Sequence, residues 1–345
     1  MKYFNFSELK MPVIQAPMAG GFNTPELASS VANSGGVGSF GFSFTTPEKI
    51  DETLKITKKL TNGFLNANFF VFKPVELPGK EIQHRAIEAL SSLPFNESYR
   101  LTIPDKPFYE DLDNQIEATL ENLPSIITFH LGMPSVSIID KIKTLGIKVG
   151  ITATTIEEAL SIEKIGADFI VAQGIEAGGH RGIFEQDKKD KKNKLDTLLR
   201  QILKNTSIPI VAAGGIMDGK DIKRVINIGS KAAQLGTAFL TCKEAGTSTI
   251  HKHYLLNEQK RKTKLTKAFS GRLARGIVNI FIEKMEGKTI LPFPLQNTLT
   301  GPIRKVSVSK NNGEYINLWA GKNFSKVRSV SSSQLMKELK NEFKN

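Results

Sequence analysis

Short apolar segments alternate with longer amphipathic segments along roughly the first 240 residues. The apolar segments are rich in β-branched and aromatic residues, which is typical of strands buried on both faces. The amphipathic segments carry helix-start signals, such as Thr24 before Pro25 and Thr46 before Pro47. Strands that alternate with helices at this spacing indicate βαβ units and therefore an α/β fold with a parallel sheet.

The pattern predicts strands at 13–16, 37–40, 64–69, 126–129, 148–151, 169–172, 208–213 and 232–235. It predicts helices at 25–33, 46–60, 112–122, 135–144, 155–165, 195–203 and 218–228. Eight strands with intervening helices make a (β/α)₈ TIM barrel, a fold that needs about 250 residues. We therefore assign residues 1–241 to the barrel.

Two stretches do not follow the alternation. Residues 73–111 are interrupted by prolines, and we expect them to form an insertion after the third strand, over the sheet, with a broken helix at 81–93. Residues 242–345 form a C-terminal addition that we expect to cover the barrel mouth or to build a subunit contact. Within it, 243–281 is predicted to be mostly helical and polar, 287–302 irregular, and 331–343 a peripheral amphipathic helix.

The sixth predicted strand runs directly into a glycine-rich loop that ends at a single imidazole, His180. Gly174, Gly178, Gly179 and Gly182 allow backbone angles that side chains forbid, so this loop is not expected to contain a strand. The carboxyl ends of parallel strands are where barrels carry their active sites. His180 is therefore the candidate catalytic residue.

Two glycine turns follow the last two strands, Gly214-Gly215 after the seventh and Gly236-Thr237 after the eighth. Barrels often bind a phosphate at these positions, with loop amides and a helix amino end. A bound phosphate compound would extend across the mouth toward strand-top residues, which are Met18, Asn68, Gln173 and His180. That layout suits FMN better than a small sugar phosphate.

Charge and composition narrow the function classes. The net charge is +13, but the one dense run, Asp187 to Lys194, contains two acids and no aromatic residue for stacking on a base, so we expect a solvated loop and no nucleic-acid partner. A positive field that attracts small anions is the alternative use of the charge. No apolar run approaches the roughly 18 residues that span a bilayer, and the first ten residues do not form a signal peptide. We expect a cytoplasmic protein without a membrane partner, and no sequence feature defines its oligomeric state.

Five motifs occur in one order along the chain. They are Q-A-P-M-A-G (15–20), A-Q-G-I-E-A-G-G-H-R-G (172–182), P-I-V-A-A-G-G-I (209–216), Q-L-G-T (234–237) and F-S-G-R-L-A-R-G-I (269–277). Together they resemble the nitronate monooxygenase family, formerly called 2-nitropropane dioxygenases. One departure from that pattern is Leu273, where the family often has Pro, and it affects only the local turn.

The resemblance implies a flavoprotein that uses FMN and molecular oxygen to convert anionic alkyl nitronates, such as propionate 3-nitronate, to carbonyl compounds and nitrite. Transferred by motif, the residues in contact with FMN would be Asn68, Gln173, Gly178, Gly214, Gly215 and the segment Gln234, Leu235, Gly236 and Thr237, with Pro17 and Met18 beside the ring. His180 would polarise the nitronate, or take the α-proton of a neutral nitroalkane as general base.

The other candidate side chains carry weaker signals. His130 ends the fourth strand and is a candidate for the same pocket. His251 and His253 have a spacing seen in metal sites but no third ligand nearby, so we expect no metal site and exposed side chains, as for His84. The single cysteine, Cys242, permits no internal disulfide and is expected to be a packing residue rather than a nucleophile.

Two other flavin enzymes remain alternatives at this point, and a third is disfavoured. The FMN-dependent enoyl-acyl carrier protein reductases share the barrel and a similar G-G-H loop, and some related sequences are NADH:quinone reductases. The R-L-A-R-G segment and the long C-terminal addition favour the monooxygenase. The dihydrouridine synthases open with a similar A-P-M-A-G motif, but they need a Cys acid near the mouth, and residues 60–180 contain no Cys.

Overall fold

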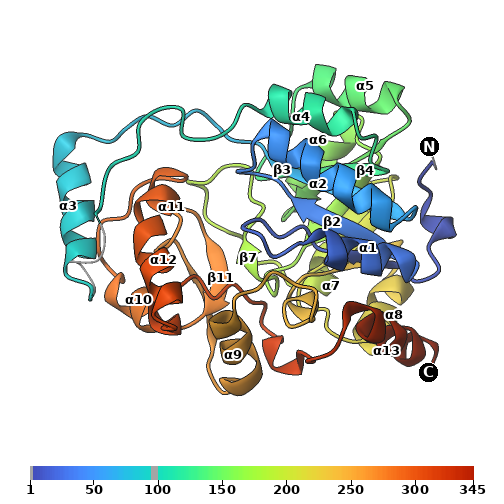
Figure 1. Ribbon diagram of the computed structural model, residues 1–345. Helices are drawn as coiled ribbons and strands as arrows, with labels where there is room; N and C mark the ends of the chain where they lie inside the picture. The colour runs from blue at the N-terminus through green and yellow to red at the C-terminus, as the bar shows by residue number, and fades with distance from the viewer. Residues whose placement is uncertain (1–2, 95–99) are drawn as a thin grey trace.

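Eight parallel strands close into a barrel in a computed structural model that describes residues 3–94 and 100–345 (Figure 1). The strands are β1 (Val13–Gln15), β2 (Val37–Gly41), β3 (Phe64–Phe70), β4 (Ile126–His130), β5 (Lys148–Ala153), β6 (Phe169–Gln173), β8 (Ile210–Ala213) and β9 (Ala232–Leu235). Each pairs in parallel with the next, and β9 closes the ring on β1, with Val13 opposite Ala233. The predicted (β/α)₈ barrel is confirmed.

Helices connect the strands on the outside of the barrel. They are α1 (Pro25–Asn33), α2 (Pro47–Leu60), α4 (Leu112–Leu120), α5 (Val136–Thr144), α6 (Ile156–Lys164), α7 (Leu195–Asn205) and α8 (Gly219–Ile228). Their starts are set by side chains that accept backbone N–H groups: the Thr24 side chain accepts from Leu27, and Thr155 forms a capping box with Glu158. These local signals explain why the predicted helix starts differ little from the observed ones.

The two ends of the barrel interior differ in polarity. Phe4, Phe64 and Phe169 belong to an apolar cluster inside the barrel, and the Phe4 and Phe64 rings meet edge to face at 5.1 Å. Toward the carboxyl ends of the strands, buried polar side chains replace the aromatic ones: Asn68 Nδ2 donates to Thr128 Oγ1 at 2.9 Å. The aromatic end closes the barrel, and the polar end lies under the mouth.

The insertion and part of the C-terminal addition share a second hydrophobic core. Helix α3 (Lys80–Ser91) contributes Ala86 and Leu90. Helices α10 (Ile280–Lys284), α11 (Leu295–Leu299) and α12 (Gly301–Ser309) contribute further residues, and the segments beside them supply the rest. Figure 1 shows α3 beside these helices, away from the barrel, so the expected position over the sheet is wrong. The helix is also continuous rather than broken, and residues 95–99 of the insertion lie outside the described residues.

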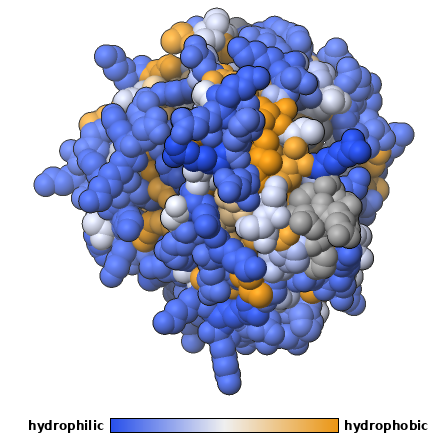
Figure 2. Space-filling model, turned by 90° about the vertical axis from the view of Figure 1, so that its left-hand side faces the viewer, coloured by the Kyte–Doolittle hydropathy of each residue, from blue (hydrophilic) through white to orange (hydrophobic). Residues whose placement is uncertain are grey.

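On the face formed by these helices, apolar side chains are set among a mostly polar surface (Figure 2). The exposed apolar residues of the insertion and of α12 include Leu77, Ile82 and Val308.

A small antiparallel sheet corrects two predictions. Its strands are β10 (Thr263–Thr266), β11 (Ala274–Ile277) and β7 (Gly179–His180), and Ala274 lies opposite His180. The loop after β6 therefore does contain a strand. Residues 243–281 are not mostly helical, because their described α-helical part is α9 (Thr249–Asn257) and the first two residues of α10, with β10 and β11 between them. The stretch 287–302 is also more regular than predicted, since α11 and the first two residues of α12 lie in it.

The last helix, α13 (Ser332–Lys344), packs against α1 and α8 on the outside of the barrel. The approach to α8 is close, because a Cβ on Gly219 would lie 2.4 Å from the Phe343 nitrogen. Short 3₁₀ turns complete the described chain at η1 (Phe6–Glu8), η3 (Thr237–Phe239), η4 (Gly313–Tyr315) and η5 (Phe324–Lys326). The described helices include none with the length and apolar character to cross a bilayer. The division at residue 241 stays a prediction.

Candidate active site

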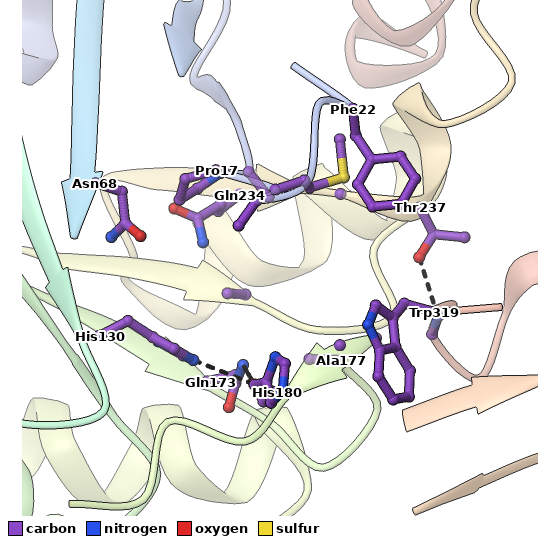
Figure 3. A pocket seen from close by; sticks show the side chains of 18 of the residues that line it. Pro17, Phe22, Asn68, His130, Gln173, Ala177, His180, Gln234, Thr237 and Trp319 are labelled. Atoms are coloured by element: carbon purple, nitrogen blue, oxygen red, sulfur yellow. Dashed lines mark hydrogen bonds between the residues drawn. The ribbon is translucent and has the colours of Figure 1, made fainter. Parts of the chain in front are cut away.

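A cavity of about 350 Å³ opens at the carboxyl ends of the barrel strands (Figure 3). Its walls come from the turns after the strands and from the C-terminal addition, which contributes Asn297, Arg304, Asn317, Trp319 and Gly321. The volume falls in the range of small-molecule and cofactor sites, and the position is where barrel enzymes carry their chemistry.

The cavity brings together almost all the residues singled out from the sequence. Those that line it are Pro17, Met18, Asn68, Gln173, Gly178, His180, Gly214, Gly215, Gln234, Gly236 and Thr237. Leu235 stands apart, because its side chain is 1% exposed and belongs to the main hydrophobic core rather than to the cavity wall. In a strand, side chains alternate in direction, so Leu235 points away from the side that Gln234 faces.

The two glycine turns are tied to a segment of the addition that crosses above them. Asn323 Nδ2 donates to the Gly215 carbonyl at 2.7 Å, and the Gly321 N–H donates to Thr237 Oγ1 at 3.0 Å. Gly215 has φ +69°, in the left-handed region that glycine adopts without strain. A Cβ on Gly178 would lie 2.6 Å from the Ala320 carbonyl carbon, so this contact requires glycine.

His180 lies half-buried in the cavity wall on β7. Its Nε2 is 2.9 Å from Ser270 Oγ, and the rings of Phe70, Phe293 and Trp319 surround it at centroid distances of 5.5–5.8 Å. Burial lowers the pKa of His180 to about 3, and the nearby positive charges, including Arg304, add to the effect. The imidazole is therefore neutral at physiological pH.

Buried hydrogen bonds fix the loop that carries His180. Gln173 Nε2 donates to the His180 carbonyl at 3.0 Å, and Gln173 Oε1 accepts from the Gly182 N–H at 2.8 Å. The side chain of Arg181 is 1% exposed, donates to Gln173 and pairs with Asp190 at 2.8 Å. We expected the run 187–194 to be solvated along its whole length, and this is wrong for Asp190. Asp190 is buried, where it neutralises the charge of the buried Arg181.

The remaining histidines lie in three different places: the cavity wall, the protein interior and the surface. His130 lines the cavity as predicted, and its Nε2–H donates to the His180 carbonyl at 3.2 Å; burial lowers its pKa to about 4. His251 is 2% exposed, so the prediction of an exposed side chain is wrong for it, and burial lowers its pKa to about 4. It packs against Phe22 across 5.8 Å between ring centroids. His253 and His84 are exposed, as predicted.

The thiol of Cys242 is buried in the main core, and burial raises its pKa to about 12, in agreement with a packing role.

Several cavity residues were missed from the sequence. Phe70 is the last residue of β3 and Ser43 follows the end of β2 by two residues, so a position at or just after a strand top was an available signal. Arg304 and Trp319 come from the addition, where no strand pattern points at the mouth. Only the tertiary fold brings these last two to the site.

The closed parallel barrel and the histidine-bearing cavity at its strand tops place the protein in the class of TIM-barrel enzymes. A family model described as nitronate monooxygenase matches residues 4–342. The chain therefore belongs to the nitronate monooxygenase family and is an oxidoreductase.

Curated relatives match over nearly their whole length. The chain is 35% identical to a probable nitronate monooxygenase of Bacillus subtilis, covering 99% of this chain and 96% of the relative. It is 36% identical to a nitronate monooxygenase of Paraburkholderia phytofirmans, covering 96% and 92%.

Among solved structures, a nitroalkane oxidase from Streptomyces ansochromogenes is similar, with a TM-score of 0.92 and 34% identity over 98% of this chain and 97% of that one. FabK from Thermotoga maritima has a TM-score of 0.74 at 22% identity over 98% and 94%, a likeness that concerns the fold alone.

Proposed function

We propose that the protein is an FMN-dependent enzyme that oxidises alkyl nitronates of the propionate 3-nitronate type with molecular oxygen, giving a carbonyl compound and nitrite. The observation that carries this proposal is the composition of the cavity wall. It combines a neutral imidazole, His180, with glycine turns at one end and a cationic side chain, Arg304, and it includes no carboxylate among the described residues.

The residues present fit FMN. Gly214, Gly215 and Gly236 leave the backbone at the last two turns open to a phosphate, which loop N–H groups bind well. The side-chain amides of Asn68 and Gln173 face the same cavity and offer hydrogen bonds to a polar ring edge (Figure 3). Pro17 and Met18 would lie beside the ring, and bound FMN would supply the electron acceptor that no side chain of this protein provides.

His180 is neutral, and this sets what it can do. A neutral imidazole carries one N–H donor and one nitrogen acceptor. Its N–H can donate a hydrogen bond to an oxygen of an anionic nitronate and so orient the substrate. With a neutral nitroalkane, it can accept the α-proton as a general base once the negative charge that develops on the substrate raises its low pKa toward the working pH. An anion bound beside it would raise its pKa from about 3, because opposite charge favours the imidazolium form.

The apolar rings around His180 exclude water from the reacting carbon. Phe70 and Phe293 pack on the imidazole from the barrel and from the addition. A low-dielectric wall strengthens the interaction of His180 with a bound anion.

One assay tests the function and separates it from the NADH-dependent alternatives. Purified holoprotein is mixed anaerobically with propyl-1-nitronate or with NADH while the flavin absorbance is followed. We expect the nitronate to bleach the flavin, and air to restore it with oxygen uptake and nitrite release. Bleaching by NADH alone, without nitrite from nitronate, would assign the protein to the reductases instead.

A further inference from the structure

Arg304 is the one residue with a permanent charge among the described residues that line the cavity. No Asp, Glu or Lys of the described chain lines this cavity, and the two histidines there, His130 and His180, are neutral because their pKa values are lowered by burial. The cavity therefore has an unbalanced positive charge.

The guanidinium of Arg304 is only partly satisfied by the protein. One nitrogen, Nη2, donates to the carbonyl and to the side-chain Oδ1 of Asn297, at 2.6 and 3.2 Å. The Nε–H is buried and has no acceptor within the described ranges. Burial alone lowers the pKa of Arg304 to about 10, and no carboxylate offsets it. Arg304 as a whole is half-buried, and a largely desolvated cation without a counter-charge destabilises a fold unless a ligand completes it.

The buried arginines of this region, in contrast, each have a carboxylate that acts on their charge. Arg181 pairs with Asp190. Arg272 also has a buried Nε without an acceptor among the described residues, and burial lowers its pKa to about 10. However, the charges of Glu158, Glu185 and Asp187 act against that lowering, and Arg272 does not line this cavity. Arg304 therefore differs from these arginines in two ways: no carboxylate offsets its charge, and its side chain lines the cavity.

We propose that Arg304, oriented by Asn297, binds a planar two-oxygen anionic group of the substrate. A nitronate carries two oxygens on a planar nitrogen, as a carboxylate does on carbon, and the guanidinium fork matches this shape with two parallel N–H donors. Arg304 and His180 line the same cavity, so one bound molecule can contact both side chains. The assignment rests on the proposed nitronate oxidation, and the anionic group is either the nitronate or a carboxylate of the same substrate.

Substitution of Arg304 tests the assignment. In Arg304→Met, we expect KM for propionate 3-nitronate to rise about tenfold to one-hundredfold, the effect of losing a charged hydrogen bond, while kcat changes less. Arg304→Lys keeps the charge without the fork and should fall between. Lys305→Met is the matched control, because Lys305 is the exposed neighbour on the same helix and its loss should leave KM unchanged.

A second substrate distinguishes the two sources of the anion. Propyl-1-nitronate has a nitronate but no carboxylate. If KM rises for both substrates, Arg304 binds the nitronate; if it rises only for propionate 3-nitronate, Arg304 binds the carboxylate. Equal kinetics of Arg304→Met and Lys305→Met would overturn the proposal, and so would purification of Arg304→Met without flavin, which would make Arg304 a cofactor residue.

A binding measurement keeps the proposal falsifiable without turnover. Asn297→Asp gives Arg304 an internal carboxylate with little change in shape. We expect the Kd of propionate, followed by the flavin absorbance of the holoprotein, to rise about tenfold or more in this variant. An unchanged Kd would contradict the proposal. If the wild-type protein binds propionate through Arg304 but releases no nitrite from nitronates, the proposed function fails while the anion site stands.

Discussion

At the scale of single residues, the environment of His180 decides its chemistry. Its burial among Phe70, Phe293 and Trp319 keeps the imidazole neutral, and its bond to Ser270 limits the orientation of the ring. The sequence located this histidine because glycines surround it after a buried strand. It did not reveal the lowered pKa, because two of the three aromatic neighbours come from the C-terminal addition.

Replacing His180 tests its assignment as the catalytic residue. We expect His180→Asn to retain its flavin and to lose about 10²- to 10⁴-fold of its nitroalkane turnover, the usual contribution of a general base. The measurement is kcat/KM beside the flavin-to-protein absorbance ratio. His253→Asn, a change at an exposed histidine, is the control and should be silent.

The pH profile adds an independent check on the same residue. Because the pKa of His180 in the free protein is about 3, kcat/KM should show no inflection from it near pH 6.5. An inflection near 6.5 that disappears in His180→Asn would show that the imidazole titrates as if exposed.

At the scale of elements, the barrel strands and their helices followed from local signals, whereas the small sheet at the mouth did not. Strand β7 has only two residues, and these are strand because they pair with β11, far along the chain. Glycine-rich sequence favours a loop, and tertiary pairing overrides that preference. Arg275 strengthens the junction, since its Nε donates to the Ile175 carbonyl at 3.1 Å.

The candidate site shows the same division. Residues at strand tops, such as Asn68 and Gln173, could be predicted because the barrel itself brings strand tops together. Arg304 and Trp319 could not, because their place at the mouth depends on how the addition packs. Whether the predicted residues bind FMN stays a prediction that the assays above test.

The loop between β6 and α7 depends on one buried ion pair. Burial alone would raise the pKa of Asp190. The hydrogen bond and the charge of Arg181, together with the Lys192 N–H and charge, outweigh this and hold the pKa below the usual value. We expect Asp190→Ala to lower the free energy of unfolding by about 3–5 kcal/mol, because it leaves the Arg181 guanidinium buried without a counter-charge. Chemical denaturation measures the effect.

Asp187→Ala is the matched control for this loop, since Asp187 is exposed. Its cost should stay within about 0.5 kcal/mol. Similar losses of unfolding free energy in Asp190→Ala and Asp187→Ala would show that the Arg181–Asp190 ion pair does not stabilise the loop specifically.

At the scale of the whole molecule, two hydrophobic cores meet at the cavity. The barrel core supplies the strand tops, and the second core, shared by α3 and α10 to α12, places the side chains that close the mouth. The insertion and the addition are far apart in sequence, so neither could be predicted to complete the other. The insertion and the addition pack on each other in the second core, and this is why neither follows the alternation of barrel strands and helices.

Stability of the whole chain should depend on pH through its buried histidines. The pKa of His251 is lowered to about 4, so below pH 6.5 the unfolded chain binds a proton that the folded chain does not. Stability that is present above pH 6.5 is therefore lost as the pH falls toward 4. We expect His251→Gln to reduce the loss of unfolding free energy between pH 7 and pH 5 by about 1–2 kcal/mol.

Denaturation at the two pH values measures this difference, with His253→Gln as the exposed control two residues away. Equal pH dependence in wild type, His251→Gln and His253→Gln would mean that His251 is protonated in the folded protein.

The bonds from Gly321 and Asn323 to the two glycine turns have a consequence for biosynthesis. During translation, the eight barrel strands leave the ribosome well before these two residues do. The mouth of a nascent barrel is therefore not yet covered by the segment that contains Gly321 and Asn323. The cavity reaches its final form only near the end of synthesis. We expect stable retention of a prosthetic group to begin at that late stage.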